Sequence, residues 1–228
     1  VEGSDLIVKK NIVYKKTIEG LQKVDVIYRR IDDDFIDPEV GNPHSVIGVK
    51  GLIRAWKNKN VAIVNAPGCG IADDKAVYSF VPEMINFYLK EDPILPNIKT
   101  FMLSNKQDRE YVFQNLRKMV TKPVAESGGY GISIGKNLNS KEINKLKKDL
   151  MKDPKNYVAQ PLIDLSTSPT FRKDSLFPRH LDLRPFILSG KKTYVTVGGL
   201  TRVALKRGST VVNSSQGGGS KDTWVVDA

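Results

Sequence analysis

The chain has 228 residues, of which 40% are hydrophobic and 27% charged, a composition typical of one large or two small globular domains. It contains no run of about 18 apolar residues that could span a membrane. Its start lacks the basic and apolar regions of a signal peptide. The single cysteine, Cys69, excludes an internal disulfide framework and favours a reducing compartment, so we expect a cytoplasmic protein with no membrane partner.

The formal net charge of +11, from 36 basic and 25 acidic residues, favours anionic partners. Much of the excess falls in a helix predicted at 140–151, where Ile143, Leu146 and Leu150 form an apolar stripe and the lysines form the solvated surface. The basic residues are scattered and are not interleaved with aromatic ones. A solvated helix surface therefore explains the charge better than a nucleic-acid site does.

The first third of the chain predicts a hairpin and a strand. Residues 5–16 alternate around Lys10-Asn11, which predicts a β-hairpin. Residues 24–30 predict a strand, and their apolar run suggests burial on both faces. That strand leads into an acidic cluster of Asp32, Asp33, Asp34 and Asp37. The cluster either holds a substrate or a metal at a strand end or is a surface loop with local ion pairs, and the sequence leaves both open.

Further along, residues 48–57 predict a short helix, residues 60–65 a strand, and Ala76 to about Lys90 one long helix with Asp73 or Asp74 as its cap. Lys75 lies beside the positive end of that helix, an unfavourable place for a cation unless an anion is held there. Cys69 lies between two glycines and has no histidine near it in sequence. We therefore interpret the cysteine as structural or incidental.

The central feature is residues 120–135, which follow a short strand at 97–103 and a helix at 108–119. They predict a strand carrying Lys122, a turn containing Gly128, Gly129 and Gly131, and a returning strand. Glycines permit positive φ and a close approach of the backbone to a ligand, and successive amides can bind an anion that Lys122 would reach. The spacing matches neither a Walker A loop nor a Rossmann fingerprint, so a glycine-rich hairpin without a ligand is the alternative.

The last third predicts mainly strands, at 156–163, 179–188, 193–197 and 200–206, with Pro161 marking an edge or a hinge. A further β-run, Thr210 to Val212, is expected to end at Asn213 and to project its amide. Residues 214–220 have the composition of a flexible linker. Because Trp224 to Val226 would supply an apolar anchor that linkers lack, we expect an ordered tail at the functional site.

Several motifs in this order resemble one family. They are "VDVIYRRIDDDFIDP", "NAPGCGIADDKA", "TKPVAESGGYGISIG", "YVAQPLIDLSTSPT", "RHLDLRPF", "GGLTRVAL" and "VVNSSQGGGSKDTWV". Together they resemble the circularly permuted type 2 ATP-grasp family of glutathionylspermidine synthase-like ligases. The resemblance implies an α/β fold with α+β subdomains, in which antiparallel sheets with flanking helices clamp a nucleotide. It also implies an ATP-dependent carboxylate–amine ligase that uses ATP and Mg²⁺, forms an acyl phosphate and acts on small-molecule or peptide carboxylate and amine substrates.

The resemblance assigns roles position by position. Lys75 and Lys122 would bind ATP phosphates, and Gly128, Gly129 and Gly131 would form the loop that covers them. Backbone groups from Gln160 to Leu162 would pair with adenine. Asp182, Arg184 and Arg202 would act at the γ-phosphate and acceptor, and Asn213 and Glu126 would bind Mg²⁺. The resemblance also suggests three regions: an N-terminal one at 1–104, a glycine-loop subdomain at 105–163 and a C-terminal sheet at 164–228.

One departure from the family pattern bears on activity. An acidic-Asn motif that supplies metal ligands, and the long portion that precedes it, do not occur in this sequence. The chain therefore resembles the C-terminal part of a longer enzyme. The alternatives are an ATP-binding module without turnover and, resting on charge alone, a basic nucleic-acid-binding protein.

Overall fold

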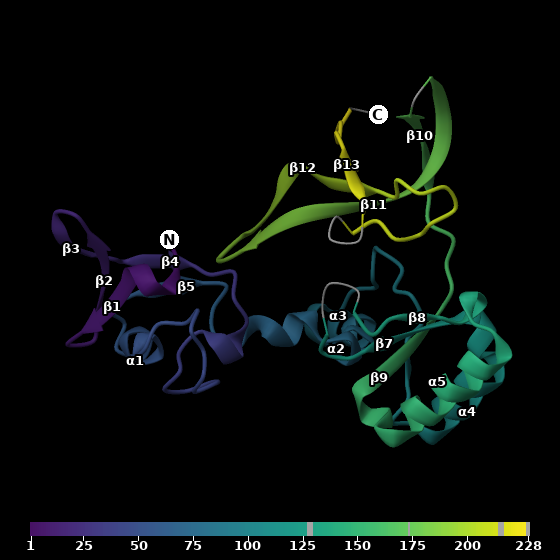
Figure 1. Cartoon of the computed structure of the whole chain (residues 1–228), viewed down its shortest axis with the longest axis horizontal. Helices are drawn as coiled ribbons and strands as arrows, with labels where there is room; N and C mark the ends of the chain where they lie inside the picture. Colours follow the sequence, from purple (N-terminus) through teal and green to yellow (C-terminus); the bar gives the residue numbers. More distant parts are fainter. Residues whose placement is uncertain (127–129, 173, 214–216, 227–228) are drawn as a thin grey trace. The chain divides into compact units, whose positions relative to one another are not determined.

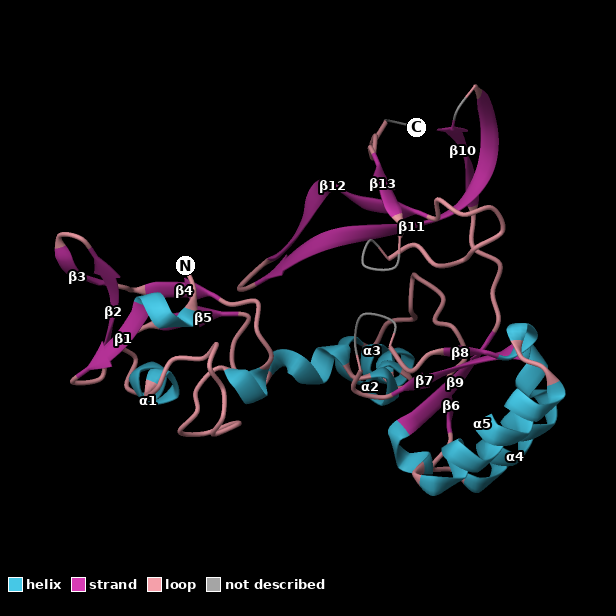
Figure 2. Ribbon diagram, in the orientation of Figure 1, coloured by secondary structure: helices cyan, strands magenta, loops and turns pink. Residues whose placement is uncertain are grey.

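The structure is a computed structural model that describes residues 1–126, 130–172, 174–213 and 217–226 (Figures 1 and 2). Contacts divide the chain into two compact units, Val1–Val81 and Pro82–Ala228. Among the described residues, no helix has both the length and the apolar character needed to cross a membrane. Short 3-10 helices cover Gly3–Asp5, Asp33–Phe35, Cys69–Asp73, Leu116–Lys118, Gly135–Asn137 and Pro154–Asn156.

Unit 1 begins with an antiparallel sheet in the order β1-β2-β3 (Leu6–Lys9, Ile12–Thr17 and Gly20–Lys23). The predicted hairpin is confirmed, since Leu6 pairs with Lys15 and Lys9 with Ile12. Lys10 and Asn11 have φ of 50° and 62°. Two successive positive φ values are those of a two-residue hairpin turn, whose twist matches that of the flanking strands.

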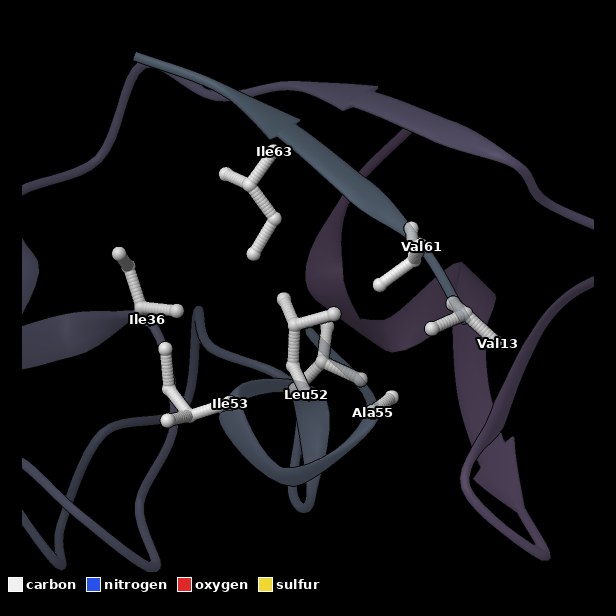
Figure 3. Packing of buried hydrophobic residues seen from close by; sticks show 8 residues of the cluster. Val13, Ile36, Leu52, Ile53, Ala55, Val61 and Ile63 are labelled. Atoms are coloured by element: carbon white, nitrogen blue, oxygen red, sulfur yellow. The ribbon is translucent and has the colours of Figure 1, made fainter. Parts of the chain in front are cut away.

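The core of unit 1 lies between helix α1 (Leu52–Lys57) and the parallel pair β4-β5 (Val26–Tyr28 and Ala62–Val64). Ile36, Leu52 and Ile63 point toward one another in this core (Figure 3). The expectation that the first of these strands is buried on both faces was wrong, because Val26 and Tyr28 are 58% and 70% exposed. In a two-stranded sheet with one packed face, only the middle residue, Ile27, turns toward the core.

The long helix expected from Ala76 to Lys90 is two helices, α2 (Lys75–Tyr78) and α3 (Val81–Leu89). Pro82 lies in the first turn of α3, a position that proline favours because it has no N–H for a preceding helical bond. Asp74 caps α2 as one of the two expected candidates, accepting hydrogen bonds from the amides of Ala76 and Val77 at 2.7 and 3.1 Å.

The first sheet of unit 2 has the antiparallel order β6-β9-β7-β8 (Phe101–Met102, Tyr157–Pro161, Met119–Pro123 and Ser133–Ile134). Helices α4 (Lys106–Asn115) and α5 (Ser140–Lys152) lie beside it (Figure 1). One core joins them, containing Phe101, Val112, Met119, Leu150 and Ala159, with Ile143 and Leu146 packed against it. The predicted apolar stripe of α5 is confirmed.

The second sheet of unit 2 has the antiparallel order β10-β11-β12-β13 (Thr167–Arg172, Ser175–Ser189, Thr193–Val203 and Gly219–Lys221). The two strands predicted at 193–197 and 200–206 are one strand, β12. Part of the expected tail, Gly219–Lys221, is β13 and pairs with β12. The chain is therefore a mixed α/β protein whose larger sheets are antiparallel.

Candidate functional site

A cavity of about 410 Å³ in unit 2 is lined by residues of both of its sheets. β7 and β9 contribute Lys122 and Gln160, β11 contributes Asp182 and Arg184, and the loop after β12 contributes Asn213. The remaining walls are mostly apolar and include Ile98, Val120, Ile132, Ile134, Leu162, Ile163 and Leu165. The structure thus brings together, around one cavity, residues from four different sequence motifs.

Lys122 lies at the β7 side of the cavity, half-buried. Its position follows from the ladder, because Lys122 pairs with Val158 and its neighbour Thr121 with Ala159. Alternate residues of a strand face opposite sides, so Thr121 is buried while Lys122 reaches the cavity. Its ammonium Nζ donates to Gln160 Oε1 at 2.7 Å.

The chain leaves β9 at Pro161, and Leu162, Ile163 and Leu165 continue along the cavity wall. The backbone amide of Leu162 donates to the carbonyl of Lys118 at 2.9 Å. Pro161 has no amide hydrogen to donate. An adenine base in this cavity would therefore have to form its hydrogen bonds with backbone groups of this segment other than the amide of Leu162.

At Asn213 in the cavity lining, two neighbouring strands present guanidinium groups to one amide oxygen, although only Arg184 of the two arginines lines the cavity itself. Arg184 NH2 and Arg202 NH1 donate to Asn213 Oδ1 at 3.3 and 3.0 Å. Arg184 also pairs with Asp182 at 2.9 Å. Asp182 is the register partner of Arg202 across β11 and β12, which places both on the same face of the sheet.

One nitrogen of the Arg202 guanidinium makes no hydrogen bond to the described part of the chain. Its Nε is buried without a hydrogen-bond partner among the described residues. Buried donors of this kind are uncommon in folded proteins and are more frequent where a ligand or water completes the site. Arg202 and Arg184 together therefore form a cationic group suited to an oxyanion.

The structure corrects how Asn213 is held. Residues 210–213 do not form the expected β-run. Asn213 is instead fixed by the two arginines and by its carbonyl, which accepts from the amide of Gly218 at 2.9 Å. The preceding strand, β12, ends at Val203, and the segment between it and Asn213 includes the polar stretch from Lys206 to Thr210.

The described part of the tail contains β13, but the expected apolar anchor is wrong. Trp224 is 84% exposed and Val226 is 78% exposed. The tail is held instead by β13, by Thr223, whose hydroxyl donates to the carbonyl of Gly199 at 2.9 Å, and by Lys221, whose Nζ donates to the carbonyl of Pro169 at 2.5 Å. Hydrogen bonds replace the expected hydrophobic contact.

The glycine turn is partly outside the described residues, which exclude Gly128 and Gly129. Gly131 has φ of +69°, and a Cβ there would approach Pro123 Cγ at 2.6 Å. Glu126 lines a separate cavity of about 420 Å³ with Tyr130 and Gly131, and neither Glu126 nor Gly131 lines the cavity that contains Lys122. The two expected metal ligands, Glu126 and Asn213, thus line different cavities.

Lys75 is the first residue of α2 and belongs to unit 1.

In the same unit the acidic cluster has structural contacts. Asp33 pairs with Arg29 at 2.8 Å, and Asp37 is 1% exposed and accepts from the amides of Gly51 and Ile53 at 3.0 and 2.9 Å. No group of three or more His, Cys, Asp or Glu residues suited to a metal occurs in the part of the chain that the structure describes. The Arg29–Asp33 pair agrees with the interpretation as a loop with local ion pairs, whereas Asp37 is buried and binds backbone amides.

Arg29 organises the loops around that cluster. Its guanidinium donates to the carbonyls of Asn65, Ile31 and Ala66 at 2.5, 2.6 and 3.0 Å. The same group lies 3.3 Å from Cys69 Sγ. Arg29 therefore joins the two loops that follow the parallel strands β4 and β5, which agrees with a structural interpretation of Cys69.

Sequence reasoning missed Thr100. Its hydroxyl accepts from Gln160 Nε2 at 2.8 Å and donates to the carbonyl of Ile98 at 3.0 Å. Thr100 is 60 residues before Gln160, and it lies outside the motifs. Only the pairing of β6 with β9 brings the two together, so no local pattern could have identified it.

The fold and the cavity define a class of protein. It is a mixed α/β protein in which two antiparallel sheets line one cavity, one sheet contributing Lys122 and the other Arg184, and most other lining residues are apolar. The comparison with known families then places it. The family model of circularly permuted ATP-grasp type 2 matches residues 1–204, and the chain belongs to that family.

Several curated relatives match nearly the whole chain. An uncharacterized protein from Synechocystis sp. is 52% identical over 227 residues, which are 99% of this chain and 47% of the relative. An uncharacterized protein from Mycobacterium tuberculosis is 50% identical over 227 residues, with 99% and 41% covered. A Frankia alni protein named "Putative glutamate--cysteine ligase 2-3" is 39% identical over 225 residues, with 99% and 26% covered. The chain spans less than half the length of these relatives.

Proposed function

We propose that this chain binds Mg-ATP in the cavity lined by Lys122 and Arg184 and serves an ATP-dependent carboxylate–amine ligase. The observation that carries the proposal is the convergence of Lys122, Gln160, Asp182, Arg184 and Asn213 on one cavity of about 410 Å³. Family membership supports it, because ATP-grasp enzymes in general use ATP and Mg²⁺.

The cavity fits the parts of ATP chemically. Its apolar walls suit the flat, weakly polar faces of adenine, and pockets for such ligands are mostly apolar with a few placed polar groups. Lys122 and Arg184 in its lining suit phosphate oxygens, and Arg202 lies beside them through its hydrogen bond to Asn213. Phosphoryl transfer depends on cations placed where charge develops. We propose that the two sheets clamp the nucleotide between them.

For Mg²⁺ the fit rests on few protein oxygens. Mg²⁺ at phosphate sites is usually held by one or two protein oxygens together with the phosphates. The cavity offers the oxygens of Asp182 and Asn213, both of which hydrogen-bond to arginine. We propose Asn213 as a ligand to the metal, and the ion would neutralise phosphate charge when bound. Glu126, the other ligand implied by the family resemblance, lines a different cavity and is left out of this proposed set.

In the proposed reaction a substrate carboxylate oxygen attacks the γ-phosphorus of ATP, forming an acyl phosphate and releasing ADP. The amine nitrogen then attacks the acyl carbon, loses a proton and releases inorganic phosphate. Arg184 and Arg202 would hold the transferring phosphoryl group and the acceptor carboxylate, because a guanidinium can bind either oxyanion in a bidentate manner. Asp182 would keep Arg184 oriented through its 2.9 Å ion pair.

The test measures ATP binding by calorimetry and then ADP release against a panel of amino acids, peptides and polyamines. Glutamate and cysteine belong in the panel because of the name of the Frankia relative. ADP release that requires both a carboxylate and an amine supports the ligase. Binding without release under any combination, also with the flanking region of a full-length relative supplied, would favour a nucleotide-binding module without turnover.

A further inference from the structure

Three side chains form a hydrogen-bonded chain beside the cavity. The Thr100 hydroxyl donates to the carbonyl of Ile98 at 3.0 Å. Gln160 Nε2 donates to Thr100 Oγ1 at 2.8 Å, and Lys122 Nζ donates to Gln160 Oε1 at 2.7 Å. The three side chains come from β7, from β9 and from the segment just before β6, which are neighbours in one sheet.

The direction of this chain follows from the chemistry of its end. A backbone carbonyl only accepts hydrogen bonds, so the Thr100 hydroxyl hydrogen is used on Ile98 and its oxygen is left to accept. The amide side of Gln160 must therefore face Thr100, and its carbonyl oxygen must face Lys122. The orientation of the Gln160 amide is thus decided by its partners, and a rotated amide would place its NH₂ against the ammonium.

Gln160 is 8% exposed, so its carboxamide depends on protein partners more than on water for its hydrogen bonds. Its oxygen is a neutral acceptor, so it locates the Lys122 ammonium without cancelling its charge, as a carboxylate would. Serial hydrogen bonds in a partly buried site also polarise one another. This arrangement holds the ammonium in place and leaves its positive charge available to attract a polyphosphate.

We propose that Gln160 and Thr100 are positioning residues that set the Lys122 ammonium for the phosphates of ATP, with the Gln160 side chain rather than its backbone as the acting group. The inference rests on the proposed function. It goes beyond it in assigning roles to the Gln160 carboxamide and to Thr100, neither of which needs to touch the nucleotide.

The experiment compares the dissociation constants of ATP and adenosine for three variants. Thr100→Val keeps the shape and removes the hydroxyl, Thr100→Ser keeps the hydroxyl, and Gln160→Glu replaces the neutral oxygen by a charged one. We expect Thr100→Val to weaken ATP binding about threefold to tenfold, Thr100→Ser to restore it, and Gln160→Glu to weaken it about tenfold or more. Adenosine has no phosphate, so its affinity should stay within about twofold.

Gln107→Glu, the same change at an exposed position of α4, controls for net charge, and thermal unfolding without nucleotide controls for the fold. Gln160→Glu retains the test if Thr100→Val does not fold. The inference is overturned if both variants bind ATP as the unaltered protein does, or if ATP and adenosine weaken equally, which would indicate a packing role. Failure of the unaltered protein to bind ATP would overturn the proposed function and the inference together.

Discussion

At the scale of single residues, Lys122 is predicted to bind ATP phosphates, both from its sequence motif and from its position in the cavity lining. Lys122→Ala should weaken ATP binding by roughly 1.5–3 kcal/mol, the range of a charge-assisted hydrogen bond. Calorimetry measures the effect. Lys118→Ala removes the same charge from an exposed side chain nearby in sequence and is the matched control. Unchanged affinity in Lys122→Ala, or an equal loss in both variants, would contradict the assignment.

The side-chain oxygen of Asn213 accepts from Arg184 and Arg202 at 3.3 and 3.0 Å. The residue could therefore bind Mg²⁺ or only align the two arginines, and substitutions distinguish these roles. Asn213→Leu should abolish the Mg²⁺ dependence of ATP binding while leaving the fold intact. Asn213→Asp should lower the Mg²⁺ concentration needed at a fixed ATP concentration, because a carboxylate is the stronger ligand for this ion. A Mg²⁺ titration that neither substitution shifts would show that the residue only aligns the arginines.

Asp37 is a residue whose role is structural in every contact it makes. It is 1% exposed and accepts from the amides of Glu39, Gly51 and Ile53. Asp37→Ala would leave these donors without their acceptor and should cost about 2–4 kcal/mol of unfolding free energy. Urea denaturation measures it, with Asp34→Ala at an exposed position of the same cluster as control. Equal stability of the two variants would argue against the contacts.

At the scale of elements, the loop at 126–131 is expected to cover the phosphates. Mg-ATP should slow amide hydrogen exchange there, because covering loops order on their ligands. The exchange of α5 provides an internal reference, since its capping box and its buried Leu150 do not depend on nucleotide. Equal exchange at 126–131 with and without Mg-ATP would contradict the prediction.

The tail offers a second test at this scale. A Cβ at Gly218 would overlap the carbonyl of Val212, the residue before Asn213. Gly218→Ala should therefore displace the tail and lower stability by about 1–3 kcal/mol, the usual cost of overpacking. Gly190→Ala is the control, because the nearest atom to its Cβ would be 3.9 Å away. Trp224→Ala should have almost no effect on unfolding, since that side chain is exposed.

At the scale of the whole molecule, the net charge of +11 would attract both ATP and nucleic acid, because both are anionic. Nucleic-acid binding through scattered lysines should fall steeply with salt, whereas ATP in a half-enclosed cavity should be screened less. We expect ATP affinity to persist at about 0.3 M salt, where attraction to a duplex oligonucleotide is lost. Duplex binding that survives that salt would support the nucleic-acid alternative.

Local patterns were enough for the elements that depend on near neighbours. The hairpin around Lys10-Asn11, the apolar stripe of α5 and a cap of α2 at Asp73 or Asp74, which the structure assigns to Asp74, follow from contacts within a few residues. The family, too, was recognised from its motifs, because their order along the chain survives without any structure. The roles assigned to Lys75, Lys122 and Asn213, and the cytoplasmic location, stay predictions.

Only the tertiary structure decided which of these residues meet. Antiparallel pairing of β6, β7 and β9 joins Thr100, Lys122 and Gln160, and pairing of β11 with β12 sets Asp182 beside Arg202. Sequence spacing could not show that Asn213 is held by two arginines or that Trp224 is exposed. The physical reason is that register and long-range hydrogen bonds, which local periodicity does not encode, determine which side chains share a cavity.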